Sequence, residues 1–205
     1  MDTARRIVAL LLLVTLPTGV LLWVVIHPLT RFWRRFGAGW TYGLLAVPCA
    51  ALMGGAWWAR GRLVGRDLGT SWPLVALAVA CAVAAGVLAR QRGRLLTFGV
   101  LAGLPELSPQ RYPGRLLTEG IYSRIRHPRY VEVVVLTLAY ALFANHVGTY
   151  VLWLLLWPTL LLVVRLEERE LGERFGADWE EYARRVPRFF PRGLSRGKKA
   201  NVPQA

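Results

Sequence analysis

Long apolar runs without charged residues alternate with short charged segments along this chain. The uncharged runs hold about half of the 205 residues and cover 7–30, 36–59, 68–89 and 133–164. A transmembrane helix needs about 20 apolar residues in succession to cross roughly 30 Å of hydrocarbon. A water-soluble fold interrupts its apolar stretches more often, because one face of each helix or strand meets solvent. The pattern therefore predicts a polytopic all-α membrane protein and excludes a soluble enzyme, a secreted disulfide-bonded module and a disordered chain.

The first three runs each predict one membrane helix, at about 7–26, 40–59 and 73–89. The fourth run is too long for one crossing, because its 32 residues would extend about 48 Å as a helix. Inside it, the sequence Asn145-His146-Val147-Gly148 has the composition of a turn. We therefore expect two helices, from about 128 to 144 and from about 147 onward, that form an antiparallel hairpin. The pattern predicts about five transmembrane helices in all.

The basic residues predict how the chain is oriented. With five crossings, the segments 27–39, 90–129 and 165–205 share one side and hold 21 of the 26 Lys and Arg residues. Basic residues concentrate on the cytoplasmic side of membrane proteins. We therefore expect an integral protein of a bacterial-type inner or plasma membrane, with its C-terminus in the cytoplasm.

Charge and cysteine content narrow the expected partners. A net charge of +14 would indicate nucleic-acid binding in a soluble chain. Here the basic residues flank apolar spans, where they contact anionic lipid headgroups, so we expect the bilayer as partner and no nucleic acid. Hydrophobic residues make up 55% of the chain, above the roughly 45–50% of soluble domains. Cys49 and Cys81 lie inside apolar runs and form no metal-binding motif, so we expect no metal site.

Three regions are expected along the chain. Residues 1–94 hold the first three helices, and the first run is too long for a signal peptide, so we expect it to be retained. Residues 95–191 hold a polar segment, the hairpin and a C-terminal amphipathic segment, and form the candidate functional core. Residues 192–205 are polar and contain Gly, Lys and Arg, which predicts a flexible tail.

Polar residues concentrate in the stretch 117–130, where the hairpin begins. Pro128 suits the first turn of a helix, because its missing N–H would have no helical partner there. The helix start then presents unpaired N–H groups and a positive dipole end, surrounded by Arg124, Arg126 and Arg129. This arrangement predicts a receptor for a carboxylate or a phosphate. The alternative is a basic cluster that binds lipid headgroups, with His127 as a local cap.

Two adjacent carboxylates, Glu167 and Glu168, follow where the second hairpin helix leaves the apolar run. Neighbouring side chains on a helix point about 100° apart, so we expect only one of them to face the helix bundle. Such a carboxylate can bind an ammonium group or the hydroxyls of a sugar. The alternative is ion pairing on a solvated face with Arg165, Arg169 or Arg174. Together with the basic cluster, the acidic pair predicts a site for a zwitterionic ligand.

Aromatic residues recur at helical spacing beyond the acidic pair, at Phe175, Trp179 and Tyr182. This spacing predicts an amphipathic segment at the membrane interface, whose aromatic side serves packing rather than cofactor binding. The segment 186–191 (Val-Pro-Arg-Phe-Phe-Pro) is expected to fold back over the end of the hairpin.

Three spaced motifs make the functional core recognisable. They are Thr118-x-Gly120-x-Tyr122-x-x-x-Arg126-His127-Pro128-x-Tyr130, Glu167-Glu168-x-x-Leu171-x-x-x-Phe175-Gly176 and Trp179-x-x-Tyr182-x-x-x-Val186-Pro187-Arg188-Phe189. In order and spacing, over about 95–191, they resemble the isoprenylcysteine carboxyl methyltransferase and phospholipid methyltransferase family. The first three helices match that family only in being hydrophobic.

The resemblance implies an integral-membrane enzyme that transfers a methyl group from S-adenosylmethionine (SAM). It also implies a cofactor pocket open to the cytosol and an acceptor that arrives through the lipid. By the same resemblance, the cofactor pocket would be lined by Gly120, Tyr122, His127, Pro128 and Tyr130, with Glu167 and Glu168 as the acidic pair. Arg126 and Arg185 are candidates to orient a carboxylate, and Arg188, in the matched ending, is a candidate for substrate binding.

Roles within the pocket follow from the chemistry of methyl transfer, an in-line displacement that needs no metal. The protein has to align donor and acceptor in dry surroundings. We expect Arg124 or Arg126, with the helix start, to receive the SAM carboxylate, and Glu167 or Glu168 to receive its ammonium group or ribose. An amine acceptor would need a base, for which Glu168 and Glu132 are candidates.

The chain departs from the family pattern at Glu132, where many relatives carry a small residue. We expect Glu132 either to bind the acceptor or to pair with Arg129 or Arg126. Trp179 also replaces a common tyrosine. The acceptor itself stays open: a prenylated peptide, a phospholipid amine, a thiol and an isoprenoid-like lipid all fit a lipid-facing pocket.

Two other functions compete with the methyltransferase. A membrane reductase of the sterol-reductase type shares the Arg-His-Pro-x-Tyr stretch and the Gly-x-x-Trp-x-x-Tyr ending, and would bind NADPH. The pair Glu167-Glu168 argues against it. A non-enzymatic membrane protein, whose basic cluster contacts lipid, would bind neither cofactor.

Overall fold

The computed structural model describes residues 1–26, 29–33, 35–95 and 115–191, which form helices and no strands. In chain order the elements are α1 (Asp2–Ile26), α2 (Thr30–Trp33), α3 (Gly37–Trp58), α4 (Arg60–Val64), α5 (Trp72–Gly93), the 3₁₀ helix η1 (Gly120–Ser123), α8 (Pro128–Ala144), α9 (Val147–Phe175) and α10 (Ala177–Arg185). The prediction of an all-α membrane protein is confirmed. Residues 96–114 of the predicted core and the predicted tail 192–205 lie outside the described residues.

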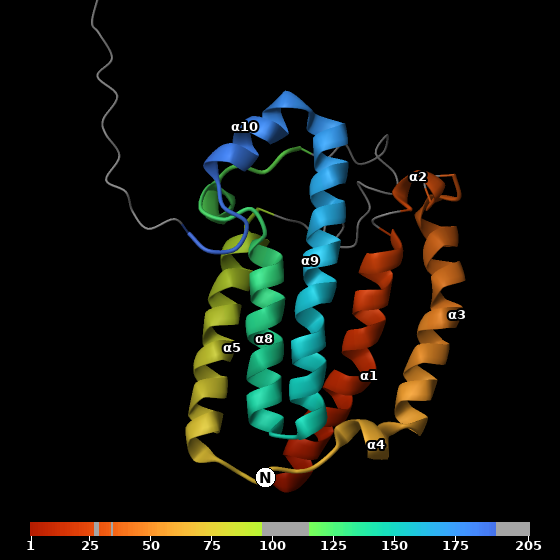
Figure 1. The fold of residues 1–205 in the computed structure, drawn as a ribbon, viewed down its shortest axis with the longest axis vertical. Coiled ribbons are helices and arrows are strands. Elements are labelled where there is room, and N and C mark those ends of the chain that lie inside the picture. Colours follow the sequence, from red (N-terminus) through yellow and green to blue (C-terminus); the bar gives the residue numbers. More distant parts are fainter. Residues whose placement is uncertain (27–28, 34, 96–114, 192–205) are drawn as a thin grey trace, which may run out of the picture.

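Five long helices, α1, α3, α5, α8 and α9, stand side by side in one bundle (Figure 1). Within the described residues, α1, α5 and α9 are long and apolar enough to cross a membrane. The helix α8 has 17 residues, and α3 has several glycines and tryptophans among its 22. Five crossings, and the orientation derived from them, therefore stay predictions. The helix α5 continues beyond its apolar run to Gly93, because the arginines of its last turn are tolerated at a helix C-terminus.

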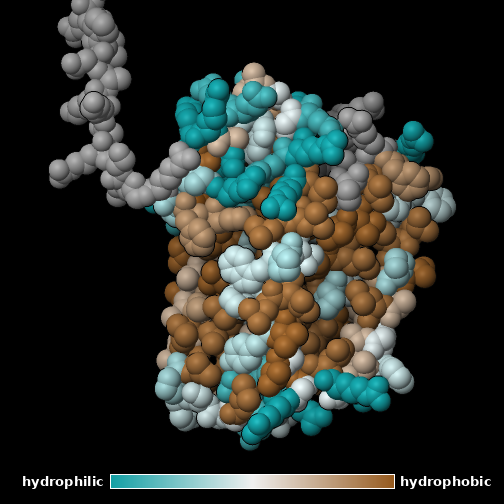
Figure 2. All heavy atoms as spheres, in the orientation of Figure 1, coloured by the Kyte–Doolittle hydropathy of each residue, from teal (hydrophilic) through white to brown (hydrophobic). Residues whose placement is uncertain are grey.

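The face of the bundle drawn in Figure 2 is mostly apolar, and the two ends of the bundle are polar. Large hydrophobic side chains are exposed along several helices, among them Leu44 and Val47 on α3, Val79 and Val83 on α5, and Leu154 and Leu155 on α9. A soluble monomer rarely exposes so much contiguous apolar surface. Lipid tails are the surroundings that this surface fits.

The hairpin of α8 and α9 lies at the centre of the bundle. The helix α8 spans the predicted 128–144 and α9 begins at the predicted residue 147, because Asn145 takes a left-handed conformation (φ +50°) that ends α8. The helix α8 packs against α5, α1 and α9. The core beside it consists of Tyr130, Leu156, Leu160, Val163 and Val164. At the turn, a Cβ atom on residue 148 would overlap the carbonyl oxygen of Leu63, so only Gly148 allows α4 to approach so closely.

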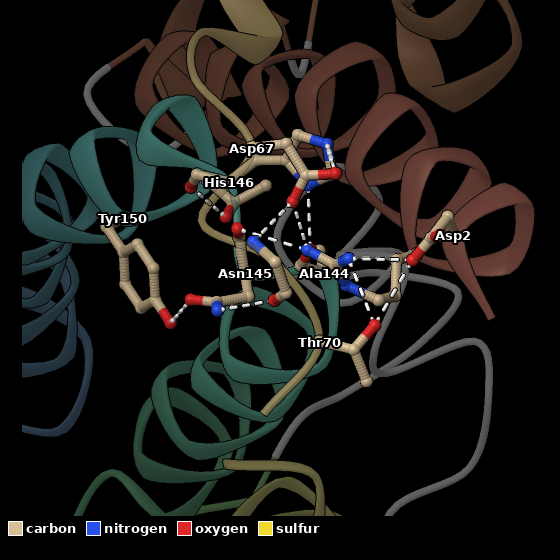
Figure 3. A network of polar contacts seen from close by, with 10 residues as sticks. Asp2, Asp67, Thr70, Ala144, Asn145, His146 and Tyr150 are labelled. Carbon is tan, nitrogen blue, oxygen red and sulfur yellow. Dashed lines mark hydrogen bonds and ion pairs between the residues drawn. The ribbon is translucent and has the colours of Figure 1, made fainter. Parts of the chain in front are cut away.

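The turn end of the hairpin is tied to the rest of the chain around the buried side chain of Arg5. Figure 3 shows Asp2, Asp67 and Thr70 gathered beside Asn145 of the turn. The guanidinium group of Arg5 contacts the side chains of Asp2, Asp67 and Thr70. The Nδ2 atom of Asn145 donates to the carbonyl of Gly69 at 2.9 Å. This network joins α1, the loop after α4 and the hairpin turn. It therefore fixes the end of the bundle that lies opposite the start of α8 (Figure 1).

Candidate functional site

The site lies at the open end of the hairpin, where α8 begins and α9 leaves the bundle. Pro128 is the first residue of α8, as predicted. The backbone N–H groups of Arg126 and His127 donate to the carbonyls of Pro187 and Arg188, at 2.8 and 3.0 Å. These bonds hold the segment 186–191 across the start of α8, which confirms that it folds back over the hairpin.

The 3₁₀ helix η1 brings Tyr122 to the same end. Gly120 begins η1 with φ +59°, and a Cβ atom there would lie 2.9 Å from Cδ1 of Leu95. A glycine therefore permits both the left-handed turn and the close approach of η1 to the end of α5. On the other side, the hydroxyl of Tyr182 on α10 donates to the carbonyl of Tyr122 at 2.8 Å. The predicted aromatic side of α10 thus serves packing: Trp179 and Tyr182 are buried against Leu171 and Phe175.

His127 connects the basic and acidic halves of the site. Its side chain is 3% exposed; Nε2 lies 3.1 Å from Oε1 of Glu168, and Nδ1 lies 3.5 Å from Oε2 of Glu167. The expectation that only one of the two glutamates faces the bundle is therefore wrong. The side chains of Glu167 and Glu168 leave α9 in directions about 100° apart, and the imidazole of His127 lies between them. Each nitrogen atom of the imidazole therefore contacts one carboxylate.

Glu168 binds three basic side chains at once. Its Oε1 atom lies 3.1 Å from Nη2 of Arg126, and both of its oxygen atoms accept from Arg188, at 2.6 to 3.0 Å. Arg126 also donates to the carbonyl of Ala183 at 2.9 Å. The three basic partners of Glu168 lie just before α8 and on the returning segment, rather than on the solvated face of α9. We call Arg126, His127, Glu167, Glu168 and Arg188 the charge cluster.

The charge cluster shifts the pKa of two groups at the helix ends. Burial alone would lower the pKa of His127, but hydrogen bonds with Glu167 and Glu168 outweigh it and raise this pKa above 6.5. Burial, with the nearby charge of Glu167, raises the pKa of Tyr122 to about 12. Tyr122 therefore stays a neutral phenol that can donate a hydrogen bond at physiological pH.

Aromatic rings enclose the charge cluster on its apolar side. The ring of Tyr130 lies 5.6 Å from that of His127 and 5.7 Å from that of Trp23, and Phe189 lies 6.0 Å from His127. The guanidinium group of Arg126 lies 5.5 Å from the ring centre of Trp179. Such surroundings lower the local dielectric and strengthen the electrostatic contacts inside.

The other predicted site residues lie around or outside the cluster. Arg185 is 67% exposed and lies 3.4 Å from Glu181 on the same helix, because Trp179 and Tyr182 occupy the inner face of α10. Arg124 is exposed, and Arg129 lies over the ring of Trp23 at 4.9 Å. The structure therefore brings Arg126, and neither Arg124 nor Arg185, to the carboxylates.

Glu132 has a partner that the sequence did not indicate. Its carboxylate accepts from Nε and Nη2 of Arg92, in the last turn of α5, at 2.8 and 3.1 Å. Glu132 is thus paired, which is one of the two expectations for it, but its partner is Arg92 rather than Arg126 or Arg129. Sequence reasoning missed Arg92 and Trp23 alike, because each reaches the site from a helix that precedes the recognisable motifs. The one available signal for Arg92 was its place at the basic end of an apolar run.

Comparisons with known proteins match this part of the chain. The family model for the "Ergosterol biosynthesis ERG4/ERG24 family" matches residues 102–193. A protein-S-isoprenylcysteine O-methyltransferase of Schizosaccharomyces pombe is 36% identical over 77 residues, which are 37% of this chain and 33% of that protein. The Delta(14)-sterol reductase TM7SF2 of Mus musculus is 34% identical over 91 residues, 42% of this chain and 21% of the reductase. The cobalt-zinc-cadmium resistance protein CzcN of Cupriavidus metallidurans is 41% identical over 88 residues, 40% and 39% of the two chains.

The resemblance to isoprenylcysteine methyltransferases is thereby confirmed over part of the chain. The matches span about a fifth to two fifths of the length of these relatives. No solved structure gives a significant match. The residues that the ERG4/ERG24 family model matches include the whole charge cluster.

Proposed function

We propose that this protein is an integral-membrane, SAM-dependent methyltransferase that acts on a lipophilic acceptor delivered by the membrane. The observation that carries the proposal is the meeting of Arg126 and His127, at the start of α8, with Glu167 and Glu168, at the exit of α9. The similarity to a protein-S-isoprenylcysteine O-methyltransferase supports the reaction class. The apolar sides of the bundle support an acceptor that reaches the site from lipid.

The chemistry of the charge cluster fits SAM. SAM carries a carboxylate, an ammonium group, a sulfonium and ribose hydroxyls, and it supplies the methyl group when it is bound. The guanidinium group of Arg126 suits a carboxylate, whereas the backbone N–H groups of Arg126 and His127 already donate to Pro187 and Arg188. The carboxylate oxygens of Glu167 and Glu168 suit an ammonium group or hydroxyls.

The contacts of the two glutamates separate their roles. Glu168 is bound by Arg126, His127 and Arg188, so it holds α8, α9 and the returning segment together. Glu167 adjoins His127 and, electrostatically, Tyr122. We therefore assign the direct contact with the ammonium group or ribose to Glu167, and the positioning of Arg126 and His127 to Glu168. Tyr122, Tyr130 and Phe189 would exclude water from the reacting groups.

Binding of SAM to the purified protein in detergent tests this assignment. Loss of a charge-assisted hydrogen bond costs about 1.5–3 kcal/mol, so Glu167→Gln should bind SAM about 10- to 100-fold more weakly. Glu168→Gln should also weaken binding and lower the melting temperature. Glu180→Gln, on the exposed face of α10, is the matched control and should behave as the wild type. Unchanged SAM affinity in both Glu167→Gln and Glu168→Gln would remove the acidic pair from the site.

Thermal unfolding of the same preparation distinguishes a methyltransferase from a reductase, the alternative function that the family model and the similarity to TM7SF2 support. SAM should raise the melting temperature and NADPH should not. The reverse result would favour the reductase, and no response to either would favour a non-enzymatic lipid-binding protein. Incubation with methyl-labelled SAM and a total lipid extract of the host would then identify the acceptor by the fraction that becomes labelled.

A further inference from the structure

Outside the charge cluster, Arg92 and Glu132 form a second buried pair of opposite charges. Arg92 belongs to α5, outside the part of the chain that resembles known methyltransferases, and Glu132 belongs to α8. Two parallel hydrogen bonds, of 2.8 and 3.1 Å, hold the guanidinium and carboxylate groups together. A bidentate pair of this kind fixes both side chains. It engages two of the three nitrogen atoms of Arg92.

The third nitrogen atom, Nη1 of Arg92, is buried and finds no hydrogen-bond partner among the described residues. The whole residue is 9% exposed. A buried donor without a partner has lost its hydration and gained nothing in return. Such atoms are rare in folded proteins, and a ligand that completes them is one explanation.

The pair lies next to the charge cluster, on the side toward the membrane. Glu132 is four residues beyond Pro128, which places it about 6 Å along α8 toward the apolar middle of the bundle. Tyr122 interacts electrostatically with Glu167 of the cluster and with both Arg92 and Glu132 of the pair. An acceptor that moves from the lipid toward the charge cluster therefore passes the level of Arg92.

The charges of the pair determine which group Nη1 can bind. An anionic group beside Arg92 would also meet the carboxylate of Glu132, and the two negative charges would repel each other. An uncharged oxygen, such as an amide or ester carbonyl, accepts from the guanidinium group without that repulsion. We propose that Arg92, held in place by Glu132, donates from Nη1 to an uncharged carbonyl oxygen in the polar end of the lipid acceptor. This inference rests on the proposed methyltransferase function and specifies its substrate.

Two probe compounds isolate the contact. N-acetyl-S-farnesyl-cysteine and S-farnesyl-3-mercaptopropionic acid share the farnesyl thioether and the carboxylate, and they differ in the acetamido group. With methyl-labelled SAM, the wild type should favour the acetamido compound in kcat/KM by about tenfold, the value of one good hydrogen bond. The quantity compared between variants is the ratio of the two kcat/KM values. A general loss of activity lowers both values equally and leaves this ratio unchanged.

Three variants complete the experiment. The double variant Arg92→Met/Glu132→Leu replaces the buried pair by apolar side chains and leaves no lone charge behind; its preference should fall to about one. Arg92→Lys, which keeps the positive charge but has one side-chain nitrogen atom in place of three, cannot bind Glu132 through two nitrogen atoms and donate from a third. It should therefore also lose most of the preference, and it serves if the double variant does not fold. Glu132→Gln keeps Nη1 and should keep the preference.

Each contrary result has its own meaning. An unchanged preference in the Arg92 variants, or equal rates on both compounds in the wild type, overturns the contact with Arg92. No methylation of either compound by a wild-type protein that binds SAM rules out a prenyl thioether acid, the acceptor class that the two probes represent, and with it the proposed contact. Failure of the wild type to bind SAM contradicts the proposed function itself.

Discussion

The Nε2 atom of His127 lies 3.1 Å from the Oε1 atom of Glu168, and this contact joins the start of α8 to the exit of α9. Arg126 and Arg188 meet the same carboxylate from two other segments. One carboxylate therefore sets the relative positions of the helix start, the helix exit and the returning segment 186–191. The geometry of the proposed cofactor site depends on these contacts.

The stability of the protein should depend on the protonation of His127. Its carboxylate neighbours outweigh burial and raise its pKa above the ordinary 6.5. A raised pKa means that protonation stabilises the fold: the contribution is complete below pH 6.5 and is lost as the pH rises through the folded-state pKa. Melting temperatures between about pH 5.5 and pH 9 should fall more steeply in the wild type than in His127→Gln; parallel curves would contradict the assignment.

Arg188 and Arg185, three residues apart, should respond differently to the same substitution. Arg188 makes a bidentate contact with Glu168 while remaining 47% exposed, so its loss should cost about 1 kcal/mol and lower the melting temperature by about 2–4 °C. Arg188→Met should also weaken SAM binding, because Glu168 would lose one of its three anchors. Arg185→Met removes a solvent-exposed pair with Glu181 and should change neither quantity. Equal effects of the two variants would show that Arg188 has no special role at the site.

The sequence predicted the hairpin and the two charged groups at its open end. Hydrophobic run length and turn composition suffice for the hairpin, because both are local properties of the chain. The motifs likewise placed His127 just before the first helix of the hairpin and Glu167 near the end of the second. Antiparallel packing of the two helices brings these residues together.

What the sequence did not predict depends on contacts between distant segments. Arg92 lies 40 residues before Glu132, and its pairing depends on how α5 rotates against α8. Trp23 reaches Tyr130 from α1 in the same way. The distinction between Arg126 and Arg185 depends on which face of α10 is buried. A pattern of residue types carries no information on such rotations.

Gly120 should be needed for two separable reasons. An alanine there would be strained at φ +59°, and its Cβ atom would lie 2.9 Å from Leu95. Gly176 also has a positive φ, +54°, but with ψ −126° and nothing within 4 Å, so Gly176→Ala introduces backbone strain of about 1–3 kcal/mol without a side-chain contact. Gly120→Ala should lower the melting temperature more in the wild type than in the Leu95→Ala background, because the smaller side chain at residue 95 removes the contact. An equal cost of Gly120→Ala in the two backgrounds would show that the contact with Leu95 is unimportant.

Arg5 should stabilise the fold without taking part in ligand binding. Its side chain is 1% exposed and holds Asp2, Asp67 and Thr70 at the turn end of the hairpin (Figure 3). In Arg5→Met the partners on the surface can be rehydrated, so we expect a loss of about 2–3 kcal/mol rather than the larger cost of a lone buried charge, and a melting temperature about 5–10 °C lower. Arg6→Met, at an exposed neighbouring position, should have little effect. Because the network lies opposite the start of α8, the folded Arg5→Met protein should bind SAM as the wild type does. A weaker affinity at a temperature where it is fully folded would show that the two ends of the hairpin are coupled.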